Sequence, residues 1–247
     1  KIQEELGAFH AWGFDVALRC GTTIMAMKVA KSMMLADPSI QTVLLAGGYR
    51  NSDFIDYTND RTRFMFNLGA GGAAMILKRD YENNTVLETD IITDGSFSED
   101  VLVPVGGTKQ PLSPEHLENG LYRLDVMDPE GMKARLEQKS MDNFLKVVRN
   151  ALLKSGYSDK DIDYLAILHM KRSAHDYVLG ELGLNTEQSI YLSDYGHVGQ
   201  MDQIISLELA EKSGKIKSGD IVVLVSAGIG YAWGAIVIKW GIEGRNI

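Results

Sequence analysis

Short apolar runs alternate with helix-like segments along this chain, and this alternation constrains the fold more than any other feature of the sequence. Segments with helical periodicity end at Pro or Gly and cover residues 24–35, 130–155, 172–182 and 201–213. The runs typical of buried strands cover residues 42–46, 73–77, 86–92, 162–168, 190–192, 221–226 and 235–239. Buried strands interleaved with helices predict an α/β protein made of packed layers of helices and sheets.

A helix followed by a strand, a glycine-rich segment and a second strand occurs twice in the chain. The part after the helix covers residues 42–77 in the first copy and residues 221–239 in the second. This repetition indicates two related halves, although the same order also recurs by chance in α/β chains. The length of 247 residues is enough for one large domain or two small ones.

Composition excludes several classes of function. The formal net charge of -8 argues against an extended nucleic-acid surface. No apolar run is long enough to span a bilayer, so we expect no membrane partner. The chain has one cysteine and no cluster of Cys and His, which argues against a disulfide and against a metal site. We therefore expect a cytoplasmic protein that holds no metal.

The single cysteine, Cys20, follows residues 14–19, which we expect to form a strand that runs into the helix at 24–35. A thiol at a helix N-terminus faces unpaired backbone N–H groups and the positive end of the helix dipole. This setting stabilises a thiolate and favours a nucleophile. A lone cysteine is also often a small buried apolar residue, so position alone leaves both interpretations open.

Two histidines lie at the ends of predicted elements. His169 follows the strand at 162–168, and His197 precedes the helix at 201–213, whereas His175 lies inside the helix at 172–182. Ligands bind at the carboxyl ends of strands in open α/β sheets, so His169 is well placed for a site. A hydrogen-bonded structural role is the alternative for each of them.

Two segments are rich in glycine, at residues 67–72 (NLGAGG) and 226–235 (SAGIGYAWGA). The first lacks the Gly-Lys-Ser/Thr ending of a phosphate-binding loop, and a strand rather than a helix follows it. We expect its glycines to allow close backbone packing. The second can offer a backbone N–H to a developing oxyanion, and it is equally compatible with a turn between two buried strands.

Taken in order, these segments resemble the thiolase-fold condensing enzymes, most closely 3-oxoacyl-acyl carrier protein synthase III. The motifs that carry the resemblance are the Cys20 segment and residues 67–74, 103–111, 127–144, 161–169, 195–197 and 228–235. The resemblance implies a thiolase-like layered α-β-α-β-α fold of two related halves, with the N-terminal part of the first half absent. Residues 1–80 would be the remainder of that half, 81–128 a connecting region, and 129–247 the C-terminal half.

The resemblance also implies a mechanism. Cys20 would take an acyl group from acyl-CoA, and the amides of Cys20 and Gly230 would form an oxyanion hole. His169 and His197 would stabilise the enolate formed when a malonyl thioester loses carbon dioxide, and a Claisen condensation would give a 3-oxoacyl product for fatty acid biosynthesis. The thioesters of coenzyme A or acyl carrier protein are the substrates, so no cofactor is expected. A homodimer that pairs through the strand at 42–46 is implied as well.

Three departures from the family pattern stand out. Position 197 is His where synthase III enzymes carry Asn, which resembles the Cys-His-His set of the elongating synthases. Lys171 and Arg172 replace part of the family's His-Gln-Ala-Asn, and they can bind phosphate or an acidic carrier protein or lie at a solvated helix start. Cys20 lies closer to residue 1 than the family nucleophile does, which suggests a fragment or a separate second chain.

Aromatic residues offer a further candidate contact with the acyl group. Phe64 and Phe66, with Phe54 and Tyr57 nearby, can line an acyl tunnel, or they can pack in the core or in a dimer interface.

Three functions are compatible with the sequence. The first is a decarboxylating condensing enzyme. The second is an acyltransferase that passes the acyl group to an amine or alcohol without decarboxylation, which residues 169–172 and 197 motivate. The third is a partner subunit of a heteromeric synthase.

Overall fold

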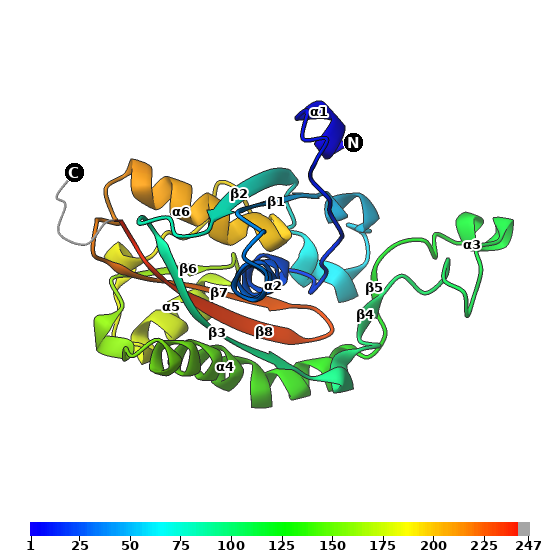
Figure 1. Cartoon of the computed structure of the whole chain (residues 1–247). Helices are drawn as coiled ribbons and strands as arrows, with labels where there is room; N and C mark the ends of the chain where they lie inside the picture. The colour runs from blue at the N-terminus through cyan, green and yellow to red at the C-terminus, as the bar shows by residue number, and fades with distance from the viewer. Residues whose placement is uncertain (242–247) are drawn as a thin grey trace.

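The computed structural model describes residues 1–241, whose two main sheets are separated by helices, and a further short pair of strands forms a third sheet (Figure 1). The strands of the larger sheet lie in the order β3 (Thr85–Thr93), β8 (Ala232–Lys239), β7 (Ile221–Gly228) and β6 (Tyr164–Ile167). In this sheet β6 runs parallel to β7, and the other neighbours are antiparallel. The smaller sheet pairs β1 (Thr42–Tyr49) with β2 (Gly71–Lys78) in antiparallel fashion.

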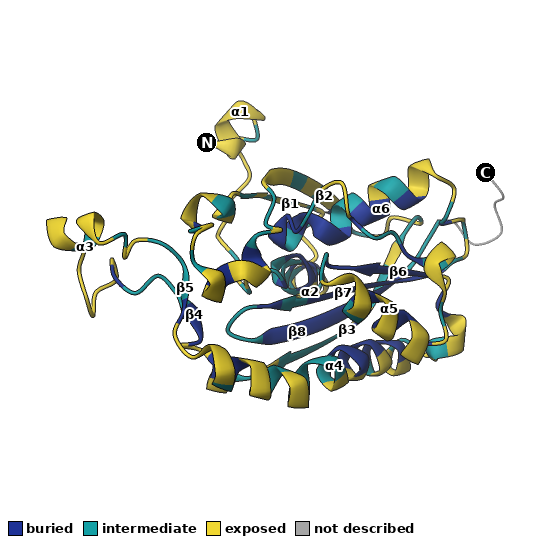
Figure 2. Cartoon of the chain, turned by 180° about the vertical axis from the view of Figure 1, so that it is seen from behind, coloured by how far each residue is buried: buried dark blue, intermediate teal, exposed yellow. Residues whose placement is uncertain are grey.

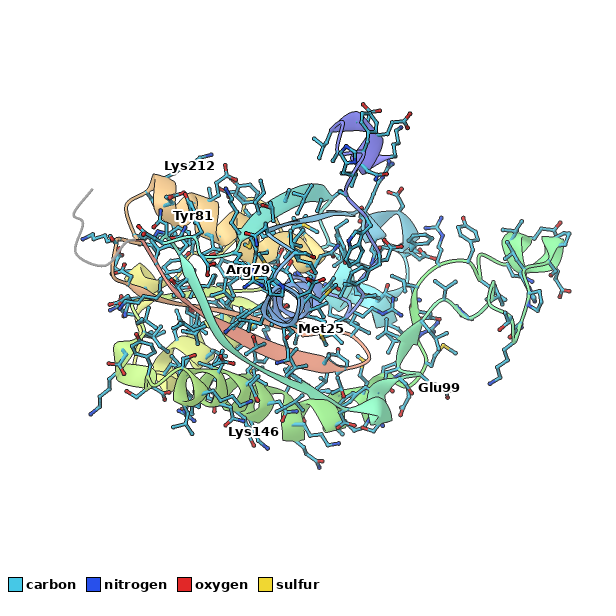
Figure 3. The ribbon with its side chains drawn as sticks, in the orientation of Figure 1. Met25, Arg79, Tyr81, Glu99, Lys146 and Lys212 are labelled. Atoms are coloured by element: carbon cyan, nitrogen blue, oxygen red, sulfur yellow. The ribbon has the colours of Figure 1, made fainter. Side chains whose placement is uncertain are left out.

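Helices lie on both faces of the larger sheet. Between the two sheets lie α2 (Thr22–Ala36) and α6 (Asp202–Lys212), and the outer face is covered by α4 (Pro129–Lys154) and α5 (Arg172–Glu181). Figure 3 shows Met25 of α2 in the inner helix layer and Lys146 of α4 directed away from the sheet. The order of layers is therefore helix, sheet, helix, sheet.

Smaller elements complete the described chain. Figure 1 shows α1 and α3 extending from the body of the molecule. The remaining helices and strands are α1 (Ile2–Glu5), α3 (Pro114–Glu118), β4 (Val101–Leu102) and β5 (Asp125–Val126). Short 3-10 turns are at Asn51–Phe54, Asp60–Met65, Gly95–Phe97, Asp159–Asp161, Thr186–Gln188 and Gly199–Met201.

Strands β6, β7 and β8 of the larger sheet are buried on both faces because they are apolar at nearly every position, whereas most residues of the edge strand β3 are half-buried or exposed (Figure 2). Side chains alternate between the two faces of a strand. Leu165, Val223 and Val237 therefore pack with α4 and α5 in one cluster, whereas Tyr164 and Val222 pack with α2 and α6 in another. Each fully buried Val or Leu stabilises the fold by about 1.5–3 kcal/mol relative to an exposed one.

Most elements predicted from the periodicity are confirmed. The four predicted helices are α2, α4, α5 and α6, and the strands predicted around the glycine-rich segments are β1, β2, β7 and β8. The prediction was wrong at residues 14–19, where only an isolated bridge joins Leu18 and Cys20, and at residues 190–192, which form no strand. Both are short segments in which tertiary contacts outweigh local β propensity.

Strand β3 lies in the region that the predicted domain division treats as connecting, yet it is hydrogen-bonded to β8 in the larger sheet. The division itself stays a prediction. Among residues 1–241 no helix is both long and apolar enough to cross a membrane. Within the same residues, no group of three or more His, Cys, Asp or Glu side chains is placed to hold a metal ion.

His175 of α5 gives a prediction about stability. Burial lowers the pKa of His175 to about 4, and its Nδ1 has no hydrogen-bond partner among the described residues. The unfolded chain binds a proton near pH 6.5, so stability should fall as the pH drops from 6.5 towards 4, by up to about 3 kcal/mol. Urea unfolding at pH 7 and at pH 4.5 measures this effect. The decrease in unfolding free energy between the two pH values should be smaller for His175→Leu than for the parent protein.

His10 provides a matched control because it is exposed. The difference in unfolding free energy between the two pH values should be the same for His10→Leu as for the parent. An unchanged difference in His175→Leu would contradict the assignment of a buried neutral imidazole.

Candidate active site

Cys20 lies in a strained turn that leads into α2. Arg19 has a φ of 51°, a left-handed conformation that costs a non-glycine residue about 1–3 kcal/mol. The Thr22 hydroxyl accepts a hydrogen bond from the Leu18 amide (2.8 Å) and donates one to the Arg19 carbonyl (2.6 Å). The Ser226 hydroxyl of β7 donates to the Cys20 carbonyl at 2.8 Å. Contacts from α2 and from β7 therefore hold this turn.

The position of Cys20 at a helix N-terminus is confirmed. Gly21 is the N-cap of α2 and has no side chain to accept hydrogen bonds from the first-turn amides. Those amides and the helix dipole favour a negative charge nearby. Cys20 is a free, half-buried thiol directly before this N-cap, so its setting favours the thiolate.

His197 is the nearest titratable partner of the thiol, with Nε2 at 3.1 Å from Cys20 Sγ. Its backbone amide donates to the Asn67 carbonyl, and its carbonyl accepts from the Gly69 amide, both at 2.8 Å. A Cβ on Gly69 would lie 2.6 Å from the Tyr195 carbonyl oxygen, so only glycine allows the two segments to approach this closely. The close backbone packing expected of residues 67–72 is thus confirmed.

Asp202, at the start of α6, is fully buried and joins the two histidines. Its Oδ2 accepts hydrogen bonds from His197 Nδ1 at 2.6 Å and from the His169 amide at 2.7 Å. Its Oδ1 accepts from the Val198 amide at 2.7 Å. Asp202 was not identified from the sequence. An acidic residue five positions after His197, at the start of a predicted helix, was the available signal.

The two histidines differ in their proton affinity. Burial alone would lower the pKa of His197, but hydrogen bonds with Asp202 and Cys20, together with the negative charges of both, raise it to about 10. Burial lowers the pKa of His169, and the positive charge of His197 adds to this while Asp202 opposes it. These opposite shifts favour a protonated His197 and a neutral His169 near neutral pH.

His169 follows β6 as predicted and lies near His197. Its ring packs against Tyr191 with ring centroids 4.8 Å apart, and its Nδ1 has no hydrogen-bond partner within residues 1–241. His175 packs against another side of Tyr191, with ring centroids 5.3 Å apart, and takes no part in the contacts around Cys20. The structure thus brings two of the three candidate histidines into the site.

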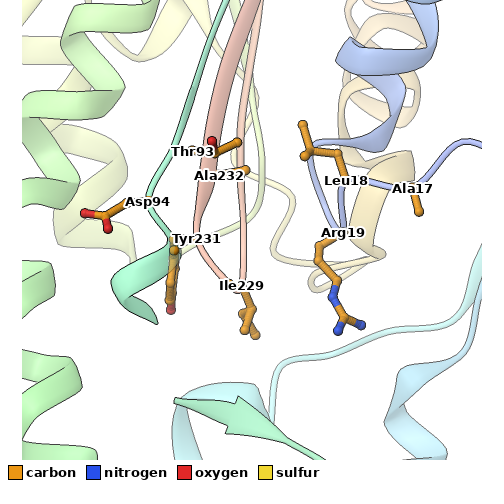
Figure 4. Close-up of a pocket in the computed structure, with 10 residues that line it drawn as sticks. Ala17, Leu18, Arg19, Thr93, Asp94, Ile229, Tyr231 and Ala232 are labelled. Carbon is orange, nitrogen blue, oxygen red and sulfur yellow. The ribbon is translucent and has the colours of Figure 1, made fainter. Parts of the chain in front are cut away.

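Gly230 lies in the turn between β7 and β8, which packs against the turn that carries Cys20. A Cβ on Gly228 would lie 2.8 Å from the Leu18 carbonyl oxygen and 3.0 Å from the Cys20 amide nitrogen. A pocket of about 340 Å³ adjoins both turns, and Figure 4 shows Arg19 at its edge across from the β7–β8 turn. Its lining residues are Ala17, Leu18, Arg19, Thr93, Asp94, Gly95, Ile229, Gly230, Tyr231 and Ala232.

The four predicted substrate-binding residues are not among those that line the pocket beside Cys20. Arg172 forms an ion pair with Asp176 and lies 5.0 Å over the Tyr191 ring, and Lys171 is exposed at the start of α5. Phe66 packs against Tyr57 (5.1 Å) and against the apolar cluster around Met65. Phe64 is exposed. Their roles in binding stay predictions.

Comparisons with known proteins agree with this geometry. Residues 14–95 match the family profile 3-Oxoacyl-[acyl-carrier-protein (ACP)] synthase III, and residues 152–240 match the profile of its C-terminal part. The beta-ketoacyl-[acyl-carrier-protein] synthase III of Aliarcobacter butzleri is 29% identical over 241 residues, which are 97% of this chain and 70% of that protein. The enzyme of the same name from Clostridioides difficile is 28% identical over 240 residues, with the same coverage.

A solved structure shares the fold. The 3-oxoacyl-(acyl carrier protein) synthase III of Pseudomonas aeruginosa superimposes with a TM-score of 0.81 at 21% identity, over 97% of this chain and 71% of that one. The layered fold and the cysteine at a helix N-terminus define a thiolase-fold condensing enzyme, which is an acyltransferase. The two profiles together span more than half of the sequence, and the chain belongs to the 3-oxoacyl-[acyl-carrier-protein] synthase III family.

Gly228 gives a test of how the site is built. A Gly228→Ala substitution should displace the backbone at Leu18 and Cys20, because the new Cβ would lie 2.8 Å from the Leu18 carbonyl oxygen and from Arg19 Cβ, and 3.0 Å from the Cys20 amide nitrogen. We expect a loss of about 1–3 kcal/mol in unfolding free energy and a slower reaction of Cys20 with iodoacetamide. Gly107→Ala is the matched control, since nothing lies within 4 Å of its Cβ position. Equal reaction rates in both variants would contradict the proposed packing of the two turns.

Proposed function

We propose that this protein forms an acyl thioester on Cys20 and condenses it with a malonyl thioester, with loss of carbon dioxide, to give a 3-oxoacyl thioester. The observation that carries this proposal is the 3.1 Å contact between His197 Nε2 and a thiol placed directly before the N-cap of α2. An activated thiol is the nucleophile that transfer from one thioester to another requires. The names of the relatives support the same reaction.

In the first step the Cys20 thiolate attacks the carbonyl carbon of an acyl-CoA. The bond between that carbon and the coenzyme A sulfur breaks, and coenzyme A leaves as a thiolate that takes a proton from solvent. The amides of Cys20 and Gly230 are our candidates for the donors that stabilise the tetrahedral oxyanion. The packing of the β7–β8 turn against the Cys20 turn supports this assignment.

In the second step a malonyl thioester loses carbon dioxide, and its enolate carbon attacks the acyl carbon on Cys20. The Cys20 thiolate leaves, and the 3-oxoacyl thioester is released. The enolate oxygen needs fixed hydrogen-bond donors, and our candidates are His169 and His197, both of which are held by Asp202 Oδ2. No step requires a resident cofactor or metal ion, because the thioesters carry the reacting groups.

The same proposal covers the partners. Acyl-CoA would be the donor and acyl carrier protein would bring the malonyl group, with Lys171 and Arg172 as candidate contacts for its acidic surface or for phosphate. Phe64 and Phe66 stay candidates for the acyl tunnel. We place the enzyme in the cytoplasm, where a thiol nucleophile stays reduced.

A homodimer would pair through β1. One edge of this strand is bonded to β2, and no other strand among the described residues is paired with it. Alternate residues of the two strands, including Leu44 and Ile76, expose an apolar face.

Acyl transfer to an amine or alcohol is the second candidate. The lowered pKa of His169 favours it, because an unprotonated imidazole in the site can accept a proton from an incoming amine or alcohol. Release of carbon dioxide from malonyl-CoA separates the two functions, since only the condensation produces it. The third candidate, a partner subunit of a heteromeric synthase, predicts that Cys20→Ala leaves the activity of the assembled complex intact.

Acylation can be measured directly by intact-protein mass spectrometry. Incubation with acetyl-CoA or a longer acyl-CoA should add one acyl mass to the parent protein, and Cys20→Ala should add none. His169→Ala should still acylate but should release carbon dioxide from malonyl-CoA at least tenfold more slowly, because one enolate donor is lost. His10→Ala, at an exposed position, is the control. No adduct with any acyl-CoA would overturn the proposal.

A further inference from the structure

We infer that Asp202 is a positioning residue that keeps His197 protonated throughout the reaction, so that His197 acts as a charged hydrogen-bond donor while His169 acts as a neutral one. This inference rests on the proposed function for its place in the reaction. The protonation of His197 itself can be tested without any acyl substrate.

The first support is the burial of the carboxylate. Asp202 has no exposed surface, and three donors surround it, namely His197 Nδ1 and the amides of His169 and Val198. Two backbone amides only partly offset a buried negative charge, whereas a protonated His197 supplies a full positive charge at 2.6 Å. Hydrogen bonds between charged groups are also roughly twice as strong as neutral ones.

The groups that face His197 all come from different elements. Cys20 precedes α2, Asp202 begins α6, and His169 follows β6. The Tyr49 ring at the end of β1 lies with its centroid 6.0 Å from that of His197, and burial, the largest cause, raises the pKa of its hydroxyl. Tyr49 is therefore neutral, and Asp202 and Cys20 supply the negative charge that His197 faces.

Acylation removes one of these two charges. Once Cys20 is a thioester, its sulfur no longer attracts the proton of His197, but the contact with Asp202 is unchanged. His197 then presents a protonated Nε2 towards the space beside the acylated sulfur. A charged donor there stabilises an enolate more strongly than a neutral amide would.

His169 differs although it lies beside the same carboxylate. It touches Asp202 through its backbone amide rather than through its ring, and its Nδ1 has no partner among residues 1–241. The His169 ring therefore has no hydrogen bond with Asp202 that would stabilise its protonated form. The Asp202 carboxylate thus holds the backbone of His169 and stabilises the positive charge of His197.

A purely structural role for Asp202 is the competing explanation, since its Oδ1 accepts the Val198 amide near the start of α6. The two roles differ in the charge of His197. A residue that only holds the loop before α6 would stabilise the fold and leave His197 with an ordinary titration, whereas the positioning role keeps both ring nitrogens of His197 protonated well above pH 6.5.

Nitrogen-15 NMR of histidine-labelled Cys20→Ala protein tests this directly, because only Asp202 then supports the charge. The chain has five histidines, and His197→Asn identifies the signal of His197. We expect both His197 nitrogens to carry protons at pH 7.5 and His169 to be neutral. A neutral His197 at pH 7.5 in Cys20→Ala would overturn the inference, whatever the outcome of the acylation experiments.

Alkylation of Cys20 by iodoacetamide gives the second test. In the parent protein the rate should stay nearly constant from pH 8 to pH 6, because His197 holds the proton. In Asp202→Asn the rate at pH 6.5 should fall by about 10- to 100-fold, because His197 can then lose its proton and no longer supplies a positive charge beside the sulfur. Asp202→Glu should recover part of the loss, as the charge is restored.

Ser206→Ala is the matched control, since Ser206 is also fully buried on α6 and its hydroxyl bonds Tyr164 at 2.7 Å. It should lose stability without changing the pH profile of alkylation. An unchanged profile in a folded Asp202→Asn protein would overturn the inference and leave Asp202 only the structural role of holding the loop before α6. If no acyl adduct forms but the pH profile of alkylation is as expected, the proposed function is refuted and the inference about Asp202 is still supported.

Discussion

The buried carboxylate of Asp202 is the interaction on which the site depends. A negative charge without solvent needs donors from several directions, and here they come from the end of β6, from the loop before α6 and from the His197 ring. Satisfying that charge therefore fixes the positions of both histidines at once. The thiol of Cys20 adds the second negative partner of His197, and the side chains of Cys20, His197 and Asp202 form one connected network with the backbone amide of His169.

The larger sheet brings these residues together. Strands β6 and β7 are parallel, so their carboxyl ends lie at the same edge of the sheet. His169 follows β6 at this edge, and Ser226 near the end of β7 holds the Cys20 carbonyl. Helices α2 and α6 lie side by side over the inner face, which sets Cys20 at the start of one near Asp202 at the start of the other. The layers thus explain why residues far apart in sequence meet.

The fold could be predicted from the sequence to the extent that it follows from periodicity. Long helices such as α4 and the continuous apolar runs of β7 and β8 carry strong local signals. The strand predicted at residues 14–19 was wrong because the left-handed conformation of Arg19 depends on a non-local contact and on a hydrogen bond from Thr22. The non-local contact is the hydrogen bond that Ser226 donates to the Cys20 carbonyl. Asp202 was missed for a similar reason. An acidic residue at a helix start is usually a surface cap, and its burial depends on contacts that periodicity does not encode.

The histidine at position 197 has a physical consequence that the family resemblance does not convey. An asparagine there would be a neutral donor and would need no counterion. A histidine protonated in a buried site needs one, and Asp202 is placed at 2.6 Å to meet that need. The two residues therefore depend on each other: removal of Asp202 would leave His197 free to lose its proton, and removal of the imidazole would leave a buried carboxylate with only backbone donors. In this chain the second histidine is better understood as half of a charged pair than as a substitute for an amide.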